Sequence, residues 1–131
     1  MDQGKINLIF GCMFSGKSSK IISLIKRYRQ IEKYKLLLIN NSKDNRYGES
    51  VISSHDKIQI KCNSLENLMD IIDETVYKNS NVIFIEEGQF FKDLLEFCLK
   101  AADEDNKIIY VAGLDGDFKR QEFGQMCKLV P

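Results

Sequence analysis

The sequence predicts an α/β fold in which a parallel β-sheet is covered by helices on both faces. Apolar segments of strand length alternate along the chain with segments whose apolar residues recur at helical spacing. Several of the strand-like segments are apolar throughout, which is typical of strands buried on both faces. The chain has 131 residues. This length suits one domain over residues 1–131, and no repeat or linker divides it.

The first half of the chain is predicted to contain two strands and one long helix. Residues 5–10 form a short apolar strand, and residues 35–39 form a second one that is buried. Between them, residues 17–33 are predicted to be helical. The residues that carry the helical spacing are Ile21, Ile25, Tyr28 and Ile31. Residues 40–54 are polar and rich in turn-forming residues.

The second half repeats the alternation. A short strand near residues 58–62 is followed by Ser64, which we interpret as the N-cap of a helix. The apolar stripe of that helix is Leu65, Leu68, Ile72 and Val76. Residues 81–86 and 107–113 are apolar strands, and residues 93–102 between them are helical. The inward side chains of that helix are predicted to be Leu94, Leu95, Cys98 and Leu99.

The composition is that of a cytoplasmic globular protein. Lys and Arg number 19, as do Asp and Glu, so the chain has no basic excess for a nucleic-acid-binding face. No apolar run approaches the roughly 20 residues of a membrane span, and no signal-peptide pattern is present. The cysteines are widely spaced, which argues against zinc or disulfides and favours buried thiols in a reducing cytoplasm. They are Cys12, Cys62, Cys98 and Cys127.

A phosphate-binding loop is predicted between the first strand and the first helix. Residues 11–18 match the pattern G-x-x-x-x-G-K-[ST] in this strand–loop–helix setting. The loop's backbone N–H groups and the start of the helix suit a phosphate. Lys17 is suited to the terminal phosphates of ATP and Ser18 to Mg²⁺. The predicted ATP-binding residues are Gly11, Cys12, Met13, Phe14, Ser15, Gly16, Lys17 and Ser18.

Two adjacent carboxylates follow the strand at 81–86. A phosphoryl-transfer enzyme with such a loop needs a carboxylate at a neighbouring strand end to organise Mg²⁺. Glu86 and Glu87 occupy that position. Adjacent strand residues point to opposite sides of a sheet, so the two carboxylates share one role only if the chain turns there. Gly88 makes such a turn plausible.

Taken together, these stretches resemble the type II thymidine kinase family, with the poxviral members the most similar. The resemblance extends over essentially the whole chain. It rests on "GCMFSGKSS", "DNRYG", "SHD", "EEGQFF", "LLEFC" and "AGLDGDFKRQEFG", in that order. The resemblance implies transfer of the γ-phosphoryl group of ATP, with Mg²⁺, to the 5′-hydroxyl of thymidine or deoxyuridine. It also implies a homotetramer.

The resemblance also implies individual roles. Glu87 matches the family's general base, which accepts the proton of the hydroxyl nucleophile. Glu86 stands at the family's aspartate, which helps to hold Mg²⁺ through water, while Asp44 and Arg46 match residues beside the phosphates. The thymine is enclosed by an apolar pocket, whose matching residues are Met13, Phe90, Leu114, Phe118 and Phe123.

Three departures from the family pattern bear on activity. Lys20 replaces a usual glutamate, and Asn40 replaces a usual lysine. The family's C-terminal zinc-binding segment and base-covering loop have no counterpart up to Pro131, so the zinc ligands are absent from this sequence. We therefore expect ATP binding to be independent of that segment and full catalysis to depend on it. The alternatives are a truncated nucleotide-binding remnant without kinase activity and a P-loop ATPase of another class.

Overall fold

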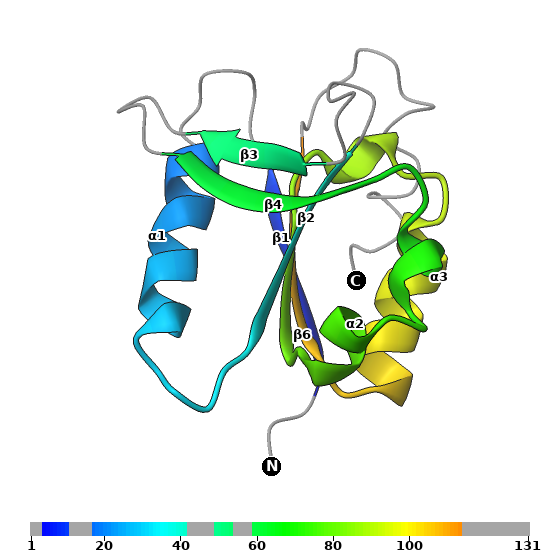
Figure 1. Ribbon diagram of the computed structural model, residues 1–131. Helices are drawn as coiled ribbons and strands as arrows, with labels where there is room; N and C mark the ends of the chain where they lie inside the picture. Colours follow the sequence, from blue (N-terminus) through cyan, green and yellow to red (C-terminus); the bar gives the residue numbers. More distant parts are fainter. Residues whose placement is uncertain (1–3, 11–16, 42–48, 54–58, 114–131) are drawn as a thin grey trace.

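A six-stranded sheet forms the centre of the computed structural model, which describes residues 4–10, 17–41, 49–53 and 59–113 (Figure 1). The strand order is β1-β6-β5-β2-β4-β3. Neighbouring strands run parallel from β1 to β4, and only β3 is antiparallel to its neighbour β4. The strands are β1 (Lys5–Phe10), β2 (Leu36–Asn41), β3 (Glu49–Ser53), β4 (Gln59–Leu65), β5 (Val82–Ile85) and β6 (Ile108–Gly113).

Helices cover both faces of this sheet, as the sequence predicted. Helix α1 (Lys17–Arg29) lies on one face, and α2 (Thr75–Asn79) and α3 (Leu94–Leu99) lie on the other (Figure 1). Three shorter elements accompany α2 and α3 along the chain. They are the 3₁₀ turns η2 (Leu68–Ile71) and η3 (Gly88–Phe90) and the π-helical turn η4 (Lys100–Glu104), which continues α3. No helix in the described ranges has the length and apolar character to cross a membrane.

The sheet separates two hydrophobic cores, and the alternation of side chains along each strand supplies both. In β5, Ile83 and Ile85 belong to the core beneath α3, whereas Val82 and Phe84 belong to the core beneath α1. All four side chains are fully buried, which explains why the sequence of this strand is apolar without interruption.

The predicted helix beginning at Ser64 is wrong. Ser64 lies inside β4, paired with Asn40 of β2, so the chain is still extended there. Beyond β4 the backbone forms the short turns η2 and α2 instead of one helix, and Val76 is 51% exposed. The carboxylate of Asp93 accepts hydrogen bonds from the backbone N–H groups of Leu68 (3.1 Å) and Met69 (2.9 Å). This distant cap stabilises the early turn.

Smaller corrections concern element boundaries. Helix α1 ends at Arg29, so Ile31 lies beyond it and is 43% exposed. Leu99 is 44% exposed because it lies outside the buried stripe of the α3–η4 segment. The residues of that stripe follow one another at spacings of three and four positions. These buried residues are Leu94, Phe97, Cys98 and Ala101. Strand β3 falls within the segment 40–54 that was predicted to be turn-rich, and among the described strands it pairs with β4 alone.

Cys98 agrees with the prediction of a buried thiol. Its side chain is fully buried in the core beneath α3, and burial raises the pKa of the thiol to about 12, with a smaller contribution from the charge of Asp93. The side chains of Cys12, Cys62 and Cys127 lie outside the described part of the structure.

Candidate functional site

The carboxyl ends of β1, β5 and β6, which several of the predicted site residues follow in the sequence, lie at one edge of the sheet. Strand β1 ends at Phe10, in register with Gly113 of β6, and β5 ends at Ile85, in register with Val111. Strand β6 lies between them, so the ends of β1 and β5 are on the order of 10 Å apart, two strand spacings. Crevices at the carboxyl ends of parallel strands are where α/β folds bind ligands.

Glu86 continues the sheet for one residue past β5 and is buried. Its backbone N–H donates to the carbonyl of Ile39 in β2 at 2.8 Å, which ties its backbone to that strand. The residue is 4% exposed, and its Oε2 atom is buried. A carboxylate oxygen is the hard ligand that Mg²⁺ prefers, so a buried carboxylate at this strand end fits the predicted metal role.

Glu87 occupies a left-handed backbone conformation, with φ 58° and ψ 45°. Its carbonyl accepts a hydrogen bond from the N–H of Phe90 at 3.1 Å and so begins the turn η3. The sequence suggested a turn at Gly88, whereas in the structure the chain turns at Glu87 itself. This turn ends the strict alternation of the strand, so Glu86 and Glu87 need not lie on opposite sides of the sheet.

Gly88 is required for a different reason from the one predicted. It is buried against β6, and a Cβ atom at this position would collide with Cγ1 of Val111. The carbonyl of Gly88 accepts from the N–H of Phe91 at 3.1 Å, which continues the turn. Close packing on β6, rather than a positive φ, thus holds the turn that carries Glu87 against the sheet.

The structure describes only part of the predicted site. It places Glu86, Glu87 and the half-buried Phe90 after β5, and it begins α1 at Lys17. The side chains of Lys17 and Ser18 are not among those described. The other predicted site residues lie outside the described ranges: Gly11, Cys12, Met13, Phe14, Ser15, Gly16, Asp44, Arg46, Leu114, Phe118 and Phe123. Of the two single-residue departures, Lys20 is exposed on α1 and Asn40 is half-buried in β2.

Asp93 is a residue that sequence reasoning missed. It immediately precedes α3, where an aspartate is usually the cap of its own helix. Its side chain makes no such bond and caps η2 instead. No local pattern reveals this, because the capped residues are 24 and 25 positions away in the chain. These two hydrogen bonds hold the segment that follows Phe91 against η2.

Within the described ranges, no group of three or more His, Cys, Asp or Glu side chains could hold a metal ion. The magnesium ligands predicted from the sequence, Ser18 and Glu86, would be fewer than such a group and would need the nucleotide to complete the coordination.

Comparison with known proteins supports the family suggested by the sequence. The family model described as thymidine kinase matches residues 4–131. The thymidine kinase of sheeppox virus is 45% identical over 131 residues, which are 100% of this chain and 71% of that protein. The cytosolic thymidine kinase of Gallus gallus is 42% identical over 98% of this chain and 56% of its own length. For the thymidine kinase of Oryza sativa the identity is 40%, and the chain spans about half of that relative, 48%.

A solved structure supports the fold. The ATPase DotB of Legionella pneumophila superposes with a TM-score of 0.58 over 98% of this chain and 35% of that chain. At 16% identity, this likeness concerns the fold alone. The predicted α/β architecture, a mainly parallel sheet with helices on both faces, is confirmed.

Proposed function

The chain belongs to the thymidine kinase family, and from that premise we propose that it transfers the γ-phosphoryl group of ATP to the 5′-hydroxyl of thymidine or deoxyuridine at the carboxyl edge of its sheet. The observation that carries the proposal is the pair of carboxylates after β5, two strands from the end of β1, where the glycine-rich loop begins. A cytoplasmic location accords with the relative that is named cytosolic. A homotetramer remains a prediction.

Glu87 is proposed as the base that accepts the proton of the 5′-hydroxyl. A sugar hydroxyl becomes a useful nucleophile when a proton acceptor lies within hydrogen-bond reach. The left-handed backbone of Glu87 and the packing of Gly88 on Val111 hold this residue in one place relative to β6. A base that is fixed before the substrate arrives loses little entropy when the reacting groups meet.

Charge neutralisation is assigned to the start of α1 and to Glu86. Lys17 would contact the terminal phosphates, with the N–H groups of residues 11–16 around them. Ser18 and Glu86 would hold Mg²⁺, which would neutralise charge on the transferring phosphoryl group. Asp44 and Arg46 are proposed to lie beside the same phosphates. The acceptor base would pack among Met13, Phe90, Leu114, Phe118 and Phe123, since aromatic faces suit a flat base.

The test of the base is Glu87→Gln, which keeps the size of the side chain and removes the proton acceptor. Loss of a general base lowers the rate by about 10²–10⁴. We expect thymidine phosphorylation to fall by this factor while the affinity for an ATP analogue is unchanged. The measurement is best made on this chain alone and on this chain extended by a family C-terminal segment. Equal phosphorylation by the extended parent and its Gln variant would place the base elsewhere.

The nucleotide site is tested separately by Lys17→Ala. Removal of a charged phosphate contact weakens ATP binding by about 1.5–3 kcal/mol. Calorimetric titration with a non-hydrolysable analogue measures it, and Lys20→Ala is the matched control because Lys20 is exposed on the same helix. Equal weakening in both variants would argue against the loop assignment. Binding of the analogue without phosphorylation, even in the extended chain, would identify a nucleotide-binding remnant.

A further inference from the structure

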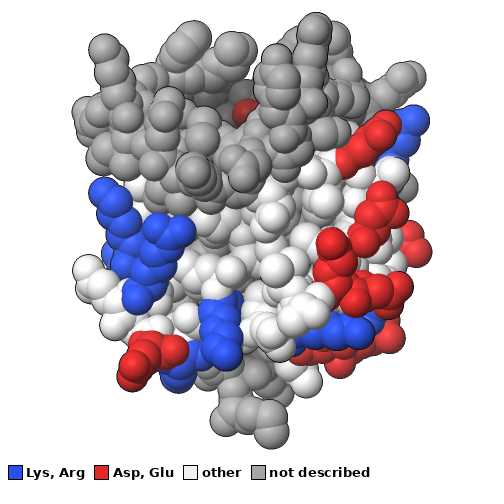
Figure 2. All heavy atoms as spheres, viewed as in Figure 1, with Lys and Arg blue, Asp and Glu red and all other residues white. Residues whose placement is uncertain are grey.

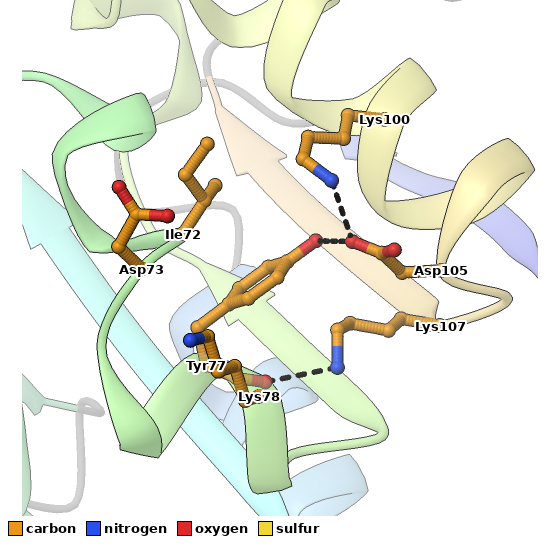
Figure 3. A pocket seen from close by; sticks show the side chains of 7 residues that line it. All are labelled: Ile72, Asp73, Tyr77, Lys78, Lys100, Asp105 and Lys107. Atoms are coloured by element: carbon orange, nitrogen blue, oxygen red, sulfur yellow. Dashed lines mark hydrogen bonds and ion pairs between the residues drawn. The ribbon is translucent and has the colours of Figure 1, made fainter.

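Two clusters of polar side chains lie at opposite edges of the sheet. At the amino edge, a cavity of about 410 Å³ is bordered by a network whose charged groups have partners (Figure 3). Oδ2 of Asp105 accepts from the hydroxyl of Tyr77 at 2.5 Å and from Nζ of Lys100 at 3.0 Å. Nζ of Lys107 donates to the carbonyls of Tyr77 (2.9 Å) and Ser80 (2.5 Å). These groups satisfy one another, so structure alone explains this network.

The second cluster, at the carboxyl edge, is a row of three side chains on neighbouring strands. Asn40 of β2 is in register with Ser64 of β4. Ile39 of β2 is in register with Ile85 of β5, so Glu86, one residue further on, lies beside Asn40. Neighbouring strands are about 4.8 Å apart. Glu86, Asn40 and Ser64 therefore follow one another across the sheet, and we call them the polar row.

The polar row faces the side of the sheet that carries α1. Leu38 and Phe84 belong to the core beneath α1, and the β2 and β5 members of the row follow them by two residues. Because side chains alternate along a strand, these members return to the same face. The β4 member directly precedes Leu65, which packs against the opposite core. Helix α1 begins at Lys17, so the polar row lies on the face where the proposed nucleotide site begins.

Burial distinguishes the polar row from an ordinary solvated strand end. Glu86 is 4% exposed, and Asn40 is half-buried. Oγ of Ser64 is buried, and no partner among the described residues lies within hydrogen-bond distance of it. A buried polar atom without a partner costs free energy, and each such atom in a native structure calls for an explanation beyond packing. The polar row is therefore not explained by structure alone, in contrast to the network at the amino edge.

The polar row carries one charge, that of Glu86, and the neighbouring Asn40 is neutral. An amide can donate a hydrogen bond to a carboxylate and leave its charge in place. An ammonium at the same position would instead compete with a metal ion for the carboxylate. The scale of such competition is known for protons, because an opposite charge at about 4–6 Å changes the proton affinity of a carboxylate by tenfold or more.

The charges on the surface do not compensate for this. Figure 2 shows that Asp and Glu side chains gather over the side that carries α2 and α3, whereas Lys and Arg lie over the side that carries α1. The polar row faces the side of α1, so the surface acids gather away from it. The residue beside Glu86 therefore decides how much of the carboxylate charge is available to a metal ion.

We propose that Asn40 is a positioning residue for Glu86, and that it keeps the carboxylate available to Mg²⁺ by supplying an amide instead of a charge. The inference rests on the proposed magnesium role of Glu86. It also connects two departures from the family pattern, glutamate for aspartate at 86 and asparagine for lysine at 40. Because these residues are neighbours on β2 and β5, the two departures belong to one site.

The test is calorimetric titration of the chain with a non-hydrolysable ATP analogue, once with Mg²⁺ and once with EDTA. The ratio of the two dissociation constants is the magnesium gain. Asn40→Lys should lower this gain by at least about threefold. The effect is smaller than on a proton because the metal is expected to contact the carboxylate through water. Asn40→Asp, which has nearly the same shape as the parent, should raise the gain because a second carboxylate attracts the metal.

The matched control is Asn63→Lys. Asn63 adjoins Ser64 on β4 but is exposed, and the alternation of the strand directs it to the opposite face of the sheet. The control adds the same charge near the same edge, and it should leave the magnesium gain unchanged. Chemical denaturation of each variant accompanies the titrations. A purely structural role for Asn40 would lower stability in both Asn40 variants and leave their magnesium gain at the parent value.

A second comparison asks whether Asn40 acts through Glu86. In a Glu86→Gln background the ammonium has no carboxylate to pair with at this position. Asn40→Lys should therefore lower the magnesium gain less in this background than in the parent, which is the coupling expected of two residues in contact.

Several results would overturn the inference. They are an unchanged magnesium gain in Asn40→Lys, effects of the same sign in Asn40→Lys and Asn40→Asp, an equal effect of Asn63→Lys, and an equal loss in the Glu86→Gln background. Each of them leaves the proposed kinase function standing, provided that the parent binds the analogue more tightly with Mg²⁺. A parent chain that gains nothing from Mg²⁺ would overturn this inference together with the magnesium role on which it rests.

Discussion

Glu87 combines a proposed chemical role with an unfavourable backbone conformation. A non-glycine residue in the left-handed region costs roughly 1–2 kcal/mol, and such strain is concentrated at functional sites. The residue that the family resemblance implies as base is therefore not the one that backbone stability alone would favour at this position. A residue selected only for stability at this position would be glycine or asparagine.

Because of this conflict, we expect that a substitution at residue 87 can increase stability while it abolishes activity. Glu87→Gly should raise the free energy of unfolding by up to about 1 kcal/mol relative to Glu87→Gln, which keeps the strain. Both variants should lose phosphoryl transfer. Chemical denaturation of the two variants gives the comparison. A Gly variant that is less stable than the Gln variant would show that the conformation is not strained in this setting.

The Tyr77–Asp105 hydrogen bond makes a pH-dependent contribution. The hydroxyl of Tyr77 and the ammonium of Lys100 both lower the pKa of the Asp105 carboxyl. A carboxyl whose pKa is lowered by folding stabilises the protein above its unfolded pKa, near 3.9, and loses that contribution as the pH falls through the folded value. Tyr77→Phe should therefore destabilise the protein by about 1 kcal/mol at pH 7.

The same difference should shrink as the pH falls below the unfolded pKa, near 3.9, and should vanish once the pH lies below the lowered pKa of Asp105 in the folded parent. Denaturation of parent and variant at several pH values measures it. Asp103→Asn is the control, since Asp103 is exposed in the same turn. A stability difference that stays constant from pH 7 to pH 3 would assign the effect of Tyr77→Phe to packing instead.

At the scale of elements, the side chain of Asp93 links η2 to the start of α3. Its carboxylate caps η2 while its own residue begins α3, so one side chain orders two elements. Asp93→Ala should cost about 1 kcal/mol, the typical loss for a capping side chain. Asp70→Ala, which removes an exposed carboxylate from η2 itself, should cost less than about 0.5 kcal/mol. Equal losses in the two variants would contradict the capping role.

The elements show where a local pattern is sufficient and where it is not. Strands β5 and β6 were predictable because both of their faces are buried and their residues are apolar without a break. The helix predicted from Ser64 fails because pairing of β4 with β2 extends the strand through this residue, and tertiary contacts override local capping preference. Strand β3 was missed because it lies within a polar stretch that was predicted to be turn-rich, and its pairing with β4 is a tertiary contact that no local pattern reveals.

At the scale of the whole molecule, the order of the strands predicts a gradient of stability. Strands β5 and β6 are paired on both sides and covered on both faces, whereas β3 pairs only with β4 among the described strands. Amides of β5 and β6 should exchange with solvent most slowly, near the rate of global unfolding, and amides of β3 should exchange faster. Hydrogen exchange followed by mass spectrometry measures this. Equal protection of β3 and β5 would contradict the gradient.

The fold, and the position of Glu86 and Glu87 after a central strand, could be predicted from the sequence. Alternating strands and helices predicted the sheet, and the motifs predicted that Glu86 and Glu87 would follow a central strand. The burial of Lys107 beside Tyr77 was not predictable, because the two residues are 30 positions apart and Lys107 looks like an ordinary charged residue at the start of a strand. Its burial follows from the position of α2, which local spacing had placed in a different helix.

The buried thiol of Cys98 can report opening of the hydrophobic core beneath α3. Alkylating reagents attack the thiolate, and a thiol with a pKa of about 12 in a fully buried position is almost inert at neutral pH. Labelling of this one side chain, read out from the peptide that contains it, therefore records how often α3 detaches from the sheet. The rate at which the label accumulates measures that opening without any substitution in the protein.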